Sequence, residues 1–297
     1  MRNALASEMP EARHRWCKWH VLKKAKESLG PVYSKNNPFK AKFHSLLNDV
    51  IEIQEFEARW AALVTEFALG ENDFMNRAYE NRSMWAKPYF VDTFCAGMTS
   101  TQRSESANHM LKTYIPRAAP MHLFVSQYAH LIADRSADEG REDHATNQVS
   151  QPLRFGVPIE AHAATVYTRA MMDRFHRELF RSGAFSCLSQ GGGSFRVERI
   201  SIDDAMASWR NEYTVHVAGE GKSYLCDCKM FEHIGMPCRH VIKVLVHCGA
   251  NEIPASLILK RWTAQAKGSA TLGSSPGGEA AVGLAVEDGG WADGGGG

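Results

Sequence analysis

Four side chains that commonly bind metal ions lie close together in the last third of the sequence. Cys226 and Cys228 form a Cys-x-Cys pair, and after a nine-residue gap Cys238 and His240 form a Cys-x-His pair. Three thiolates and one imidazole fill the four positions of a structural zinc ion, with sulfur at about 2.3 Å and nitrogen at about 2.0 Å. No position then stays open for water. The spacing therefore predicts a closed Zn²⁺ site with a structural rather than a hydrolytic role.

Two short strands and a helix are predicted to hold these ligands. Residues 213–217 and 223–227 are β-prone and flank a turn-forming stretch, which is typical of a hairpin and would deliver the first cysteine pair. After Pro237, apolar residues recur at helical spacing: Val241, Ile242, Leu245 and Val246. The second ligand pair would begin this helix, where unpaired amide groups favour a thiolate. A ββα unit is therefore expected to close around one ion.

Two alternatives to this ligand set deserve comparison. His233 lies in the gap and would be a competing ligand, although we expect it to be an exposed loop residue. Disulfides are disfavoured because the chain has seven cysteines, an odd number, and its opening residues contain no apolar signal-peptide core. Cys17 is discussed below. The other three cysteines outside the motif are expected to be buried thiols: Cys95, Cys187 and Cys248.

Composition excludes some classes of function. The 297 residues carry a net charge of +1, so overall charge does not indicate a nucleic-acid partner. No run of 18 apolar residues occurs, and no membrane span is expected. One local stretch is basic and contains Trp16 and Trp19: Arg13, Arg15, Lys18, Lys23, Lys24 and Lys26. It predicts either phosphate contacts or a solvated helix face whose tryptophans face the core.

Helical patterns dominate the sequence before the metal motif. The clearest is an apolar stripe at spacings of four, three and four, namely Phe56, Trp60, Leu63 and Phe67. A second helix is indicated by Leu123, Tyr128 and Leu131, and a third over about 159–181. We expect the aromatic stripes of these helices to face the core.

Two smaller groups of residues have types that could take part in chemistry. Cys17 and His20 form a Cys-x-x-His pair, which a helix places on one face. This is half of a metal site or a pair of buried helix residues. Glu105 lies near the start of a further predicted helix, where the helix dipole favours a carboxylate and the preceding serines and threonines are good caps.

Several motifs, taken together and in order, resemble the plant far-red-impaired-response related family. They lie at residues 14–20, 56–60, 85–90, 98–108, 158–160 and 253–263, together with the metal motif, which matches the SWIM type of zinc finger. This family resembles domesticated Mutator-like transposases. The resemblance extends from near residue 1 to about residue 267.

The resemblance implies a particular fold and a particular set of acids. The fold is α+β, a mainly helical fragment of an RNase H-like transposase core with its helical insertion, followed by a ββα SWIM module. Parent transposases hold divalent metal with two aspartates and a glutamate. Glu105 matches the glutamate, whereas the matching aspartates are expected upstream of Met1. We therefore expect an N-terminally truncated member in which Glu105 is a vestige, without transposase activity. Cys17 and His20 match the family's Cys-x-x-His element, which implies a structural role.

Four regions are expected along the chain. They are a partial transposase domain over 1–150, a helical connector with a Gly-rich loop over 151–204, the SWIM region over 205–262, and a disordered Gly/Ser-rich tail over 263–297. The resemblance implies a zinc-binding nuclear regulator of transcription. Its implied partners are duplex DNA, transcription-regulator proteins or homologous chains. The alternatives are a fragment of an active transposase and a zinc-stabilised protein-interaction module.

Overall fold

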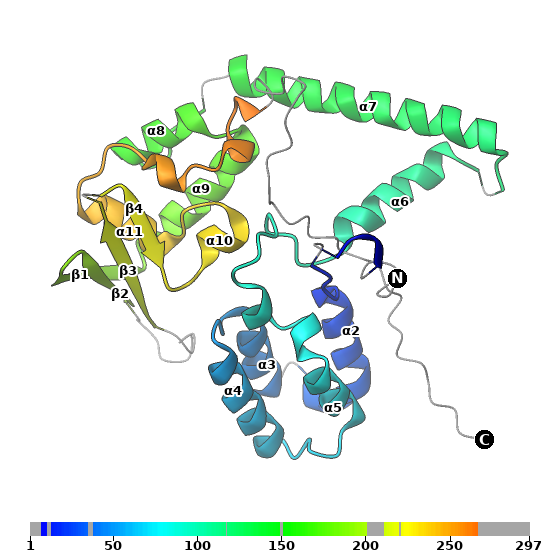
Figure 1. Ribbon diagram of the computed structural model, residues 1–297, viewed down its shortest axis with the longest axis horizontal. Helices are drawn as coiled ribbons and strands as arrows, with labels where there is room; N and C mark the ends of the chain where they lie inside the picture. Colours follow the sequence, from blue (N-terminus) through cyan, green and yellow to red (C-terminus); the bar gives the residue numbers. More distant parts are fainter. Residues whose placement is uncertain are drawn as a thin grey trace.

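The computed structural model describes residues 7–10, 13–34, 38–116, 118–148, 151–200, 211–219 and 221–266. Within these ranges the chain is mostly helical and contains one small antiparallel sheet, which confirms the coarse prediction of fold class. Figure 1 shows a helical cluster, a part that combines helices with the sheet, and a long helix that extends away from both. No helix of the described residues is long and apolar enough to cross a bilayer.

The helical cluster is built around aromatic side chains. Its elements are α2 (Lys18–Leu29), η1 (Gly30–Tyr33), α3 (Pro38–Asn48), α4 (Ile53–Glu66), α5 (Asp73–Glu80), η2 (Arg82–Met84) and η3 (Lys87–Phe90). In the predicted stripe Phe56, Trp60 and Leu63 are buried on α4, which confirms it. Trp60 and Trp85 lie 5.8 Å apart between ring centroids. Aromatic pairs of this kind contribute stability beyond their buried area.

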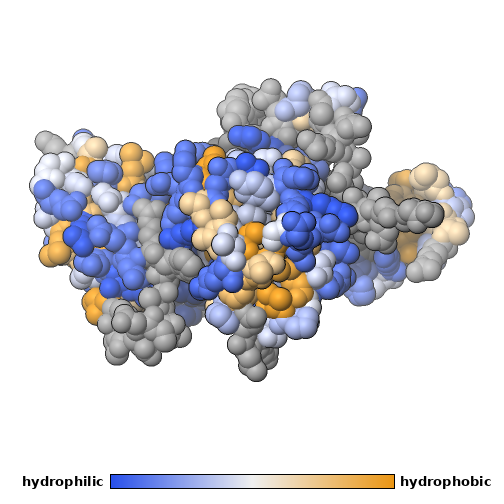
Figure 2. All heavy atoms as spheres, turned by 90° about the horizontal axis from the view of Figure 1, so that it is seen from below, coloured by the Kyte–Doolittle hydropathy of each residue, from blue (hydrophilic) through white to orange (hydrophobic). Residues whose placement is uncertain are grey.

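The face of the molecule seen in Figure 2 is largely polar. Figure 2 shows one face as mainly hydrophilic, with apolar side chains gathered in separate patches. In the basic stretch, Arg15 is buried, whereas Trp19 is 52% exposed with the Lys23 ammonium 5.3 Å from the centroid of its ring. The expectation that both tryptophans of this stretch face the core is therefore wrong for Trp19.

Helices α6 (Gln102–Tyr114) and α7 (Met121–Gln148) form a hairpin that projects from the rest of the chain (Figure 1). The predicted helix is present, but its apolar stripe is not a core face. Leu131 is the buried residue of α7, whereas Tyr128 is 46% exposed. The reason is that a projecting helix packs along one narrow line only, which periodicity along the sequence does not reveal.

The third predicted helix is divided in two. α8 (Pro158–Val166) and α9 (Arg169–Ser182) are separated by Tyr167, which is extended and pairs with Thr263 in an isolated bridge. The Ala264 amide also donates to the Val166 carbonyl at 3.0 Å. Tertiary pairing thus replaces two residues of helix. Because Thr263 and Ala264 pair with this segment, the predicted tail does not begin at residue 263. The rest of the predicted tail, residues 267–297, lies outside the described residues.

The sheet has four antiparallel strands in chain order: β1 (Phe185–Gly191), β2 (Ser194–Arg199), β3 (Glu212–Ala218) and β4 (Ser223–Cys226). The β3–β4 pair confirms the predicted hairpin. The prediction of a helical connector over 151–204 is wrong for residues 185–199, which add a second hairpin. Its turn holds Gly191, Gly192 and Gly193, all at positive φ. A side chain at Gly193 would lie 2.3 Å from the Val217 carbonyl oxygen, so a glycine is required there.

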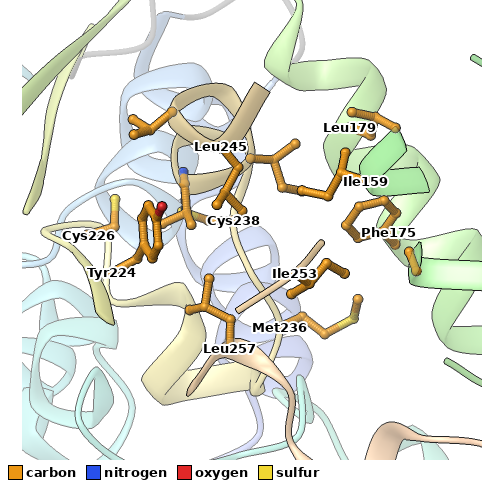
Figure 3. Packing of buried hydrophobic residues seen from close by; sticks show 14 of the residues in the cluster. Ile159, Phe175, Leu179, Tyr224, Cys226, Met236, Cys238, Leu245, Ile253 and Leu257 are labelled. Carbon is orange, nitrogen blue, oxygen red and sulfur yellow. Dashed lines mark hydrogen bonds between the residues drawn. The ribbon is translucent and has the colours of Figure 1, made fainter. Parts of the chain in front are cut away.

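Two separate apolar cores stabilise the described residues. One belongs to the helical cluster and the other unites α8 and α9 with the sheet and the helix α11 (Arg239–His247). Figure 3 shows Phe175 and Leu179 of α9 on one side of Leu245 of α11, and Cys226 and Cys238 on its other side within this second core. The predicted metal ligands are therefore part of a packed core rather than a surface loop.

Candidate metal centre

The four predicted ligands come together from two elements of the second core. Cys226 ends β4, Cys228 follows after a turn, and Cys238 and His240 begin α11. One ligand atom of each residue lies within 4.8 Å of those of the other three, the one such group of three or more candidate ligands among the described residues. Strand pairing and a helix start thus bring a 15-residue stretch into one cluster.

The geometry of the cluster fits a tetrahedral zinc ion. With zinc–sulfur and zinc–nitrogen bonds of about 2.3 and 2.0 Å, the edges of the tetrahedron between sulfur and nitrogen are about 3.5 Å long. His240 Nδ1 lies 3.6 Å from Cys226 Sγ. The other ring nitrogen, Nε2, is buried without a hydrogen-bond partner among the described residues. The Tyr213 ring stacks on the imidazole at 3.7 Å between centroids and keeps it in place.

Backbone amides support the sulfur atoms. The Cys228 amide donates to Cys226 Sγ at 3.5 Å, and the Val241 amide donates to Cys238 Sγ at 3.4 Å, as part of the N-terminal cap of α11. Such outer contacts orient ligands and stabilise negative charge on them. The first turn of α11 thus presents a backbone amide to the Cys238 sulfur.

The three thiols perturb one another inside the cluster. Hydrogen bonds from Cys226 and Cys238 lower the pKa of Cys228. The bonds to Cys228 raise the pKa of Cys226, and burial raises the pKa of Cys238. Further thiolates in this buried cluster need a cation to compensate them, which a divalent metal ion supplies.

A buried carboxylate fixes the start of α11. Glu178 on α9 accepts hydrogen bonds from the Arg239 amide at 3.2 Å and from Arg239 Nε at 2.9 Å. Arg239 lies between the ligands Cys238 and His240 in sequence. The position of two ligands is therefore tied to α9, a connection that the sequence patterns did not indicate.

The loop between the two ligand pairs attaches the zinc module to the helical cluster. It contains α10 (Met230–Ile234), and His233 of this helix is buried. His233 Nδ1 lies 3.0 Å from the Phe90 carbonyl oxygen and 3.1 Å from that of Thr93, and the Cys95 amide donates to the His233 carbonyl at 2.9 Å. The expectation of an exposed loop histidine is wrong, because this loop packs on a segment far away in the sequence.

The same loop contains a glycine that no other residue can replace without strain. Gly235 has a φ of 81°, and an added Cβ would lie 2.6 Å from Leu259 Cδ2 and 2.8 Å from Trp262 Nε1. We expect Gly235→Ala to lower the free energy of unfolding by about 3 kcal/mol, since backbone strain and overlap both act. Denaturation of the zinc-loaded protein measures this loss.

Gly249→Ala is the matched control for that substitution. Gly249 has a similar φ of 67°, but an added Cβ would meet no atom within 4 Å. This variant keeps the backbone strain of about 1 kcal/mol and lacks the overlap. Equal losses in the two variants would show that crowding at Gly235 is unimportant.

Comparison with known proteins places this centre in a family. Residues 213–249 match the family model of the SWIM zinc finger. FAR1-related sequence 5 of Arabidopsis thaliana is 31% identical over 91% of this chain and 34% of its own length. Far-red impaired response 1 of the same plant is 30% identical over 91% of this chain and 32% of its own length. The chain is a homologue of the far-red-impaired-response proteins.

The comparisons confirm the predicted resemblance and the metal. The SWIM match and the Cys₃His cluster together identify Zn²⁺ as the ion of this far-red-impaired-response homologue. FAR1-related sequence 9, also of Arabidopsis thaliana, is 23% identical over 89% of this chain and 48% of its own length. The chain spans about a third of the length of the first two relatives. No solved structure matches it.

The structure brings the other predicted residues of this homologue together. Cys17 is buried before α2, and its sulfur lies 3.3 Å from the Thr101 amide, which donates to it. Thr101 also donates to Glu105 Oε1 at 2.7 Å, and His20 Nε2 lies 3.9 Å from the same oxygen. Glu105 is in the first turn of α6 as expected, but the Thr101 hydroxyl does not cap that helix. The four residues join α2 to α6.

The other cysteines are placed differently from one another. Cys95 and Cys187 are buried thiols, as expected, whereas Cys248 is exposed at the end of α11. The expectation of a buried thiol is therefore wrong for Cys248. An exposed cysteine close to the metal ligands offers a useful control, because its substitution leaves the core intact.

Sequence reasoning gave no role to the most buried carboxylate of the second core. Glu160 in the first turn of α8 is fully buried and accepts hydrogen bonds from the amides of Arg154, Phe155 and Gly156 at 2.5, 3.0 and 2.8 Å. His176 Nε2 on α9 lies 2.8 Å from it. The motif at 158–160 contained this residue, but only folding reveals that it organises the segment before α8.

Proposed function

We propose that this protein is a transposase-derived, non-catalytic regulator of transcription that acts in the nucleus and contacts DNA. The cluster of Cys226, Cys228, Cys238 and His240 inside a SWIM match carries the proposal, with these four residues as the ligands of one Zn²⁺. The homology to far-red-impaired-response proteins supports the nuclear and regulatory part. The zinc site is closed and buried, and its role is to hold a fold.

A structural role is proposed for the residues that match transposase motifs. Glu105 is engaged by Thr101 and lies near His20, contacts that suit a link between helices. Hydrolysis by two metal ions needs several oxygen ligands around the reacting phosphate. We assign the helical residues to an RNase H-like core with its helical insertion, in which Glu105 has a structural task.

The proposal is tested by measuring zinc and DNA binding together. One zinc per chain is expected by mass spectrometry, and it is lost in the Cys226→Ser, Cys228→Ser double variant. Labelled duplex DNA is then titrated against both proteins at several salt concentrations, because phosphate contacts give a steep salt dependence. Zinc-dependent DNA binding supports a regulator, and divalent-metal-dependent strand cleavage would contradict the non-catalytic part.

A second candidate function has one observation in its favour. Exposed apolar side chains of α7 recur at spacings of four, three and four, namely Met121, Val125, Tyr128 and Ile132. An exposed stripe of this kind is typical of a helix that binds another protein. Zinc binding without DNA binding in the experiment above would favour a zinc-stabilised protein-interaction module.

A further inference from the structure

A cleft with a volume of about 700 Å³ lies between the helical cluster and the zinc module. Asn48, Lys87 and Val91 line it on the side of the helical cluster. The ligand residues Cys228, Cys238 and His240 line it on the opposite side. The cleft therefore exists only when the zinc module is folded and docked on the helical cluster.

The lining of the cleft is predominantly basic. Among the residues that the structure describes, the charged ones on the lining are Lys87, Arg181, Arg199, Lys229 and Arg239, with one carboxylate, that of Asp49. Acids behind the lining balance part of this charge: Glu178 contacts both Arg181 and Arg239, and Lys229 lies 3.8 Å from Asp92 and 3.7 Å from Glu232. These lysines and arginines come from separate segments of the sequence, and folding brings them to one cleft.

More positive charge lies behind Lys87. Lys18 has its pKa lowered to about 8 by burial and by the neighbouring charges of Arg15 and Lys87. The guanidinium of Arg15 is buried, and its Nε and Nη1 atoms have no hydrogen-bond partner among the described residues. A positive potential of this kind, next to a water-accessible cleft, attracts anions.

Size and shape select among anionic ligands. A volume of about 700 Å³ is in the range of sites that take small ligands, about 300 to 1,000 Å³, so a duplex does not enter it. Phe180 lies on the lining and is 72% exposed, which offers a ring face for stacking. Basic grooves with exposed aromatic rings are typical of proteins that bind single nucleic-acid strands.

We propose that this cleft binds the sugar–phosphate backbone of a single nucleic-acid strand, with Lys87 and Arg181 on opposite walls contacting phosphates and Phe180 stacking on a base. The inference rests on the proposed DNA contact and specifies where and in which form the nucleic acid binds. Zinc acts on this site indirectly, since it folds one wall of the cleft.

The test uses the full zinc-loaded chain and a fluorescein-labelled 12-nucleotide oligothymidine, with binding followed by fluorescence anisotropy. The Lys87→Ala, Arg181→Ala variant is expected to weaken binding at least about tenfold. It should also reduce the slope of log K against log salt concentration by about 1.4, since each phosphate contact contributes about 0.7 with single strands. Phe180→Ala is expected to weaken binding by about tenfold with an unchanged slope.

The matched control is Arg135→Ala, Arg141→Ala, which removes two exposed cations of α7. It should bind oligothymidine like the parent protein. Zinc content and melting temperature are measured for every variant, so that loss of fold is recognised. An equal loss in the control, or equally strong competition by polyglutamate, would overturn the proposal in favour of nonspecific charge or an acidic peptide.

Duplex DNA of the same length separates this inference from the proposed function. Zinc-dependent duplex binding that is insensitive to the cleft variants, without binding of the single strand, refutes the cleft site and leaves the regulator intact. Failure to bind either form contradicts both the DNA contact and the cleft site. Binding of inorganic phosphate alone, without the oligonucleotide, also overturns the assignment to a strand.

Discussion

Substitution of Cys238 by serine will abolish zinc binding and unfold the zinc module. Cys238 is 2% exposed, belongs to the second core and caps α11 with its sulfur. A structural zinc site contributes on the order of 10 kcal/mol, which is comparable to the whole stability of a small domain. Losing one of the four candidate ligands therefore leaves the other three side chains of the cluster without compensation. Metal analysis by mass spectrometry should show that the zinc content per chain falls roughly tenfold or more.

Hydrogen exchange locates the structural consequence of this substitution. Because the two cores are separate, amides of α11 and β4 should lose protection while those of α4 keep it. A chelator applied to the parent protein should give the same pattern. Retained protection of α11 after metal removal would show that the apolar core alone holds the module.

Cys248→Ser provides the matched control. It is the same chemical change in the same helix-end region, but Cys248 is exposed and is not among the four clustered ligands. Zinc content and exchange should equal those of the parent chain. A similar zinc loss in this variant would contradict the assignment of the ligands.

Substitution of Glu160 by alanine will lower the free energy of unfolding by about 3 to 5 kcal/mol, because each buried amide left without an acceptor costs about 1 to 3 kcal/mol. The change leaves three buried backbone amides without an acceptor and removes the partner of His176. The loss is measured by urea denaturation of the zinc-loaded protein at neutral pH. Glu252→Ala, an exposed glutamate, is the control and should change stability by less than about 0.5 kcal/mol.

The stabilisation by Glu160 depends on pH in a defined direction. Burial raises the pKa of this carboxyl, but hydrogen bonds from three amides and from His176 outweigh burial and lower it below the ordinary value. A carboxyl with a lowered pKa in the folded state stabilises the protein above its unfolded-state pKa, and this contribution is lost as pH falls through the folded-state pKa. The difference between parent and Glu160→Gln should therefore shrink in acid. A constant difference from neutral to acidic pH would contradict an ionised Glu160.

The metal site is the part that could be predicted from the sequence. Its ligands lie in one hairpin and one helix start, so the spacing of Cys226, Cys228, Cys238 and His240 already implies that they meet. The stripe of Phe56, Trp60 and Leu63 could also be predicted, because the periodicity of one helix determines which of its side chains share a face.

Contacts between distant segments could not be predicted in this way. His233 is buried only because residues 90–95 supply two carbonyl groups to it, about 140 residues away in the chain. Tyr128 is exposed because no other element of the described part of the chain covers that face of α7, although its spacing is that of a core residue. The hairpin at 185–199 likewise depends on β3 as a pairing partner.

The sequence by itself therefore determined the four candidate zinc ligands, the family resemblance and the local elements that present these residues. Only the tertiary structure decided that the loop between the ligand pairs docks on the helical cluster, that Cys17 meets Thr101, and that bases from separate segments surround one cleft. The physical reason is the distance along the chain between the residues that interact. Spacing along the chain records which side chains share one helix or strand, whereas burial and electrostatic potential depend on which elements pack together.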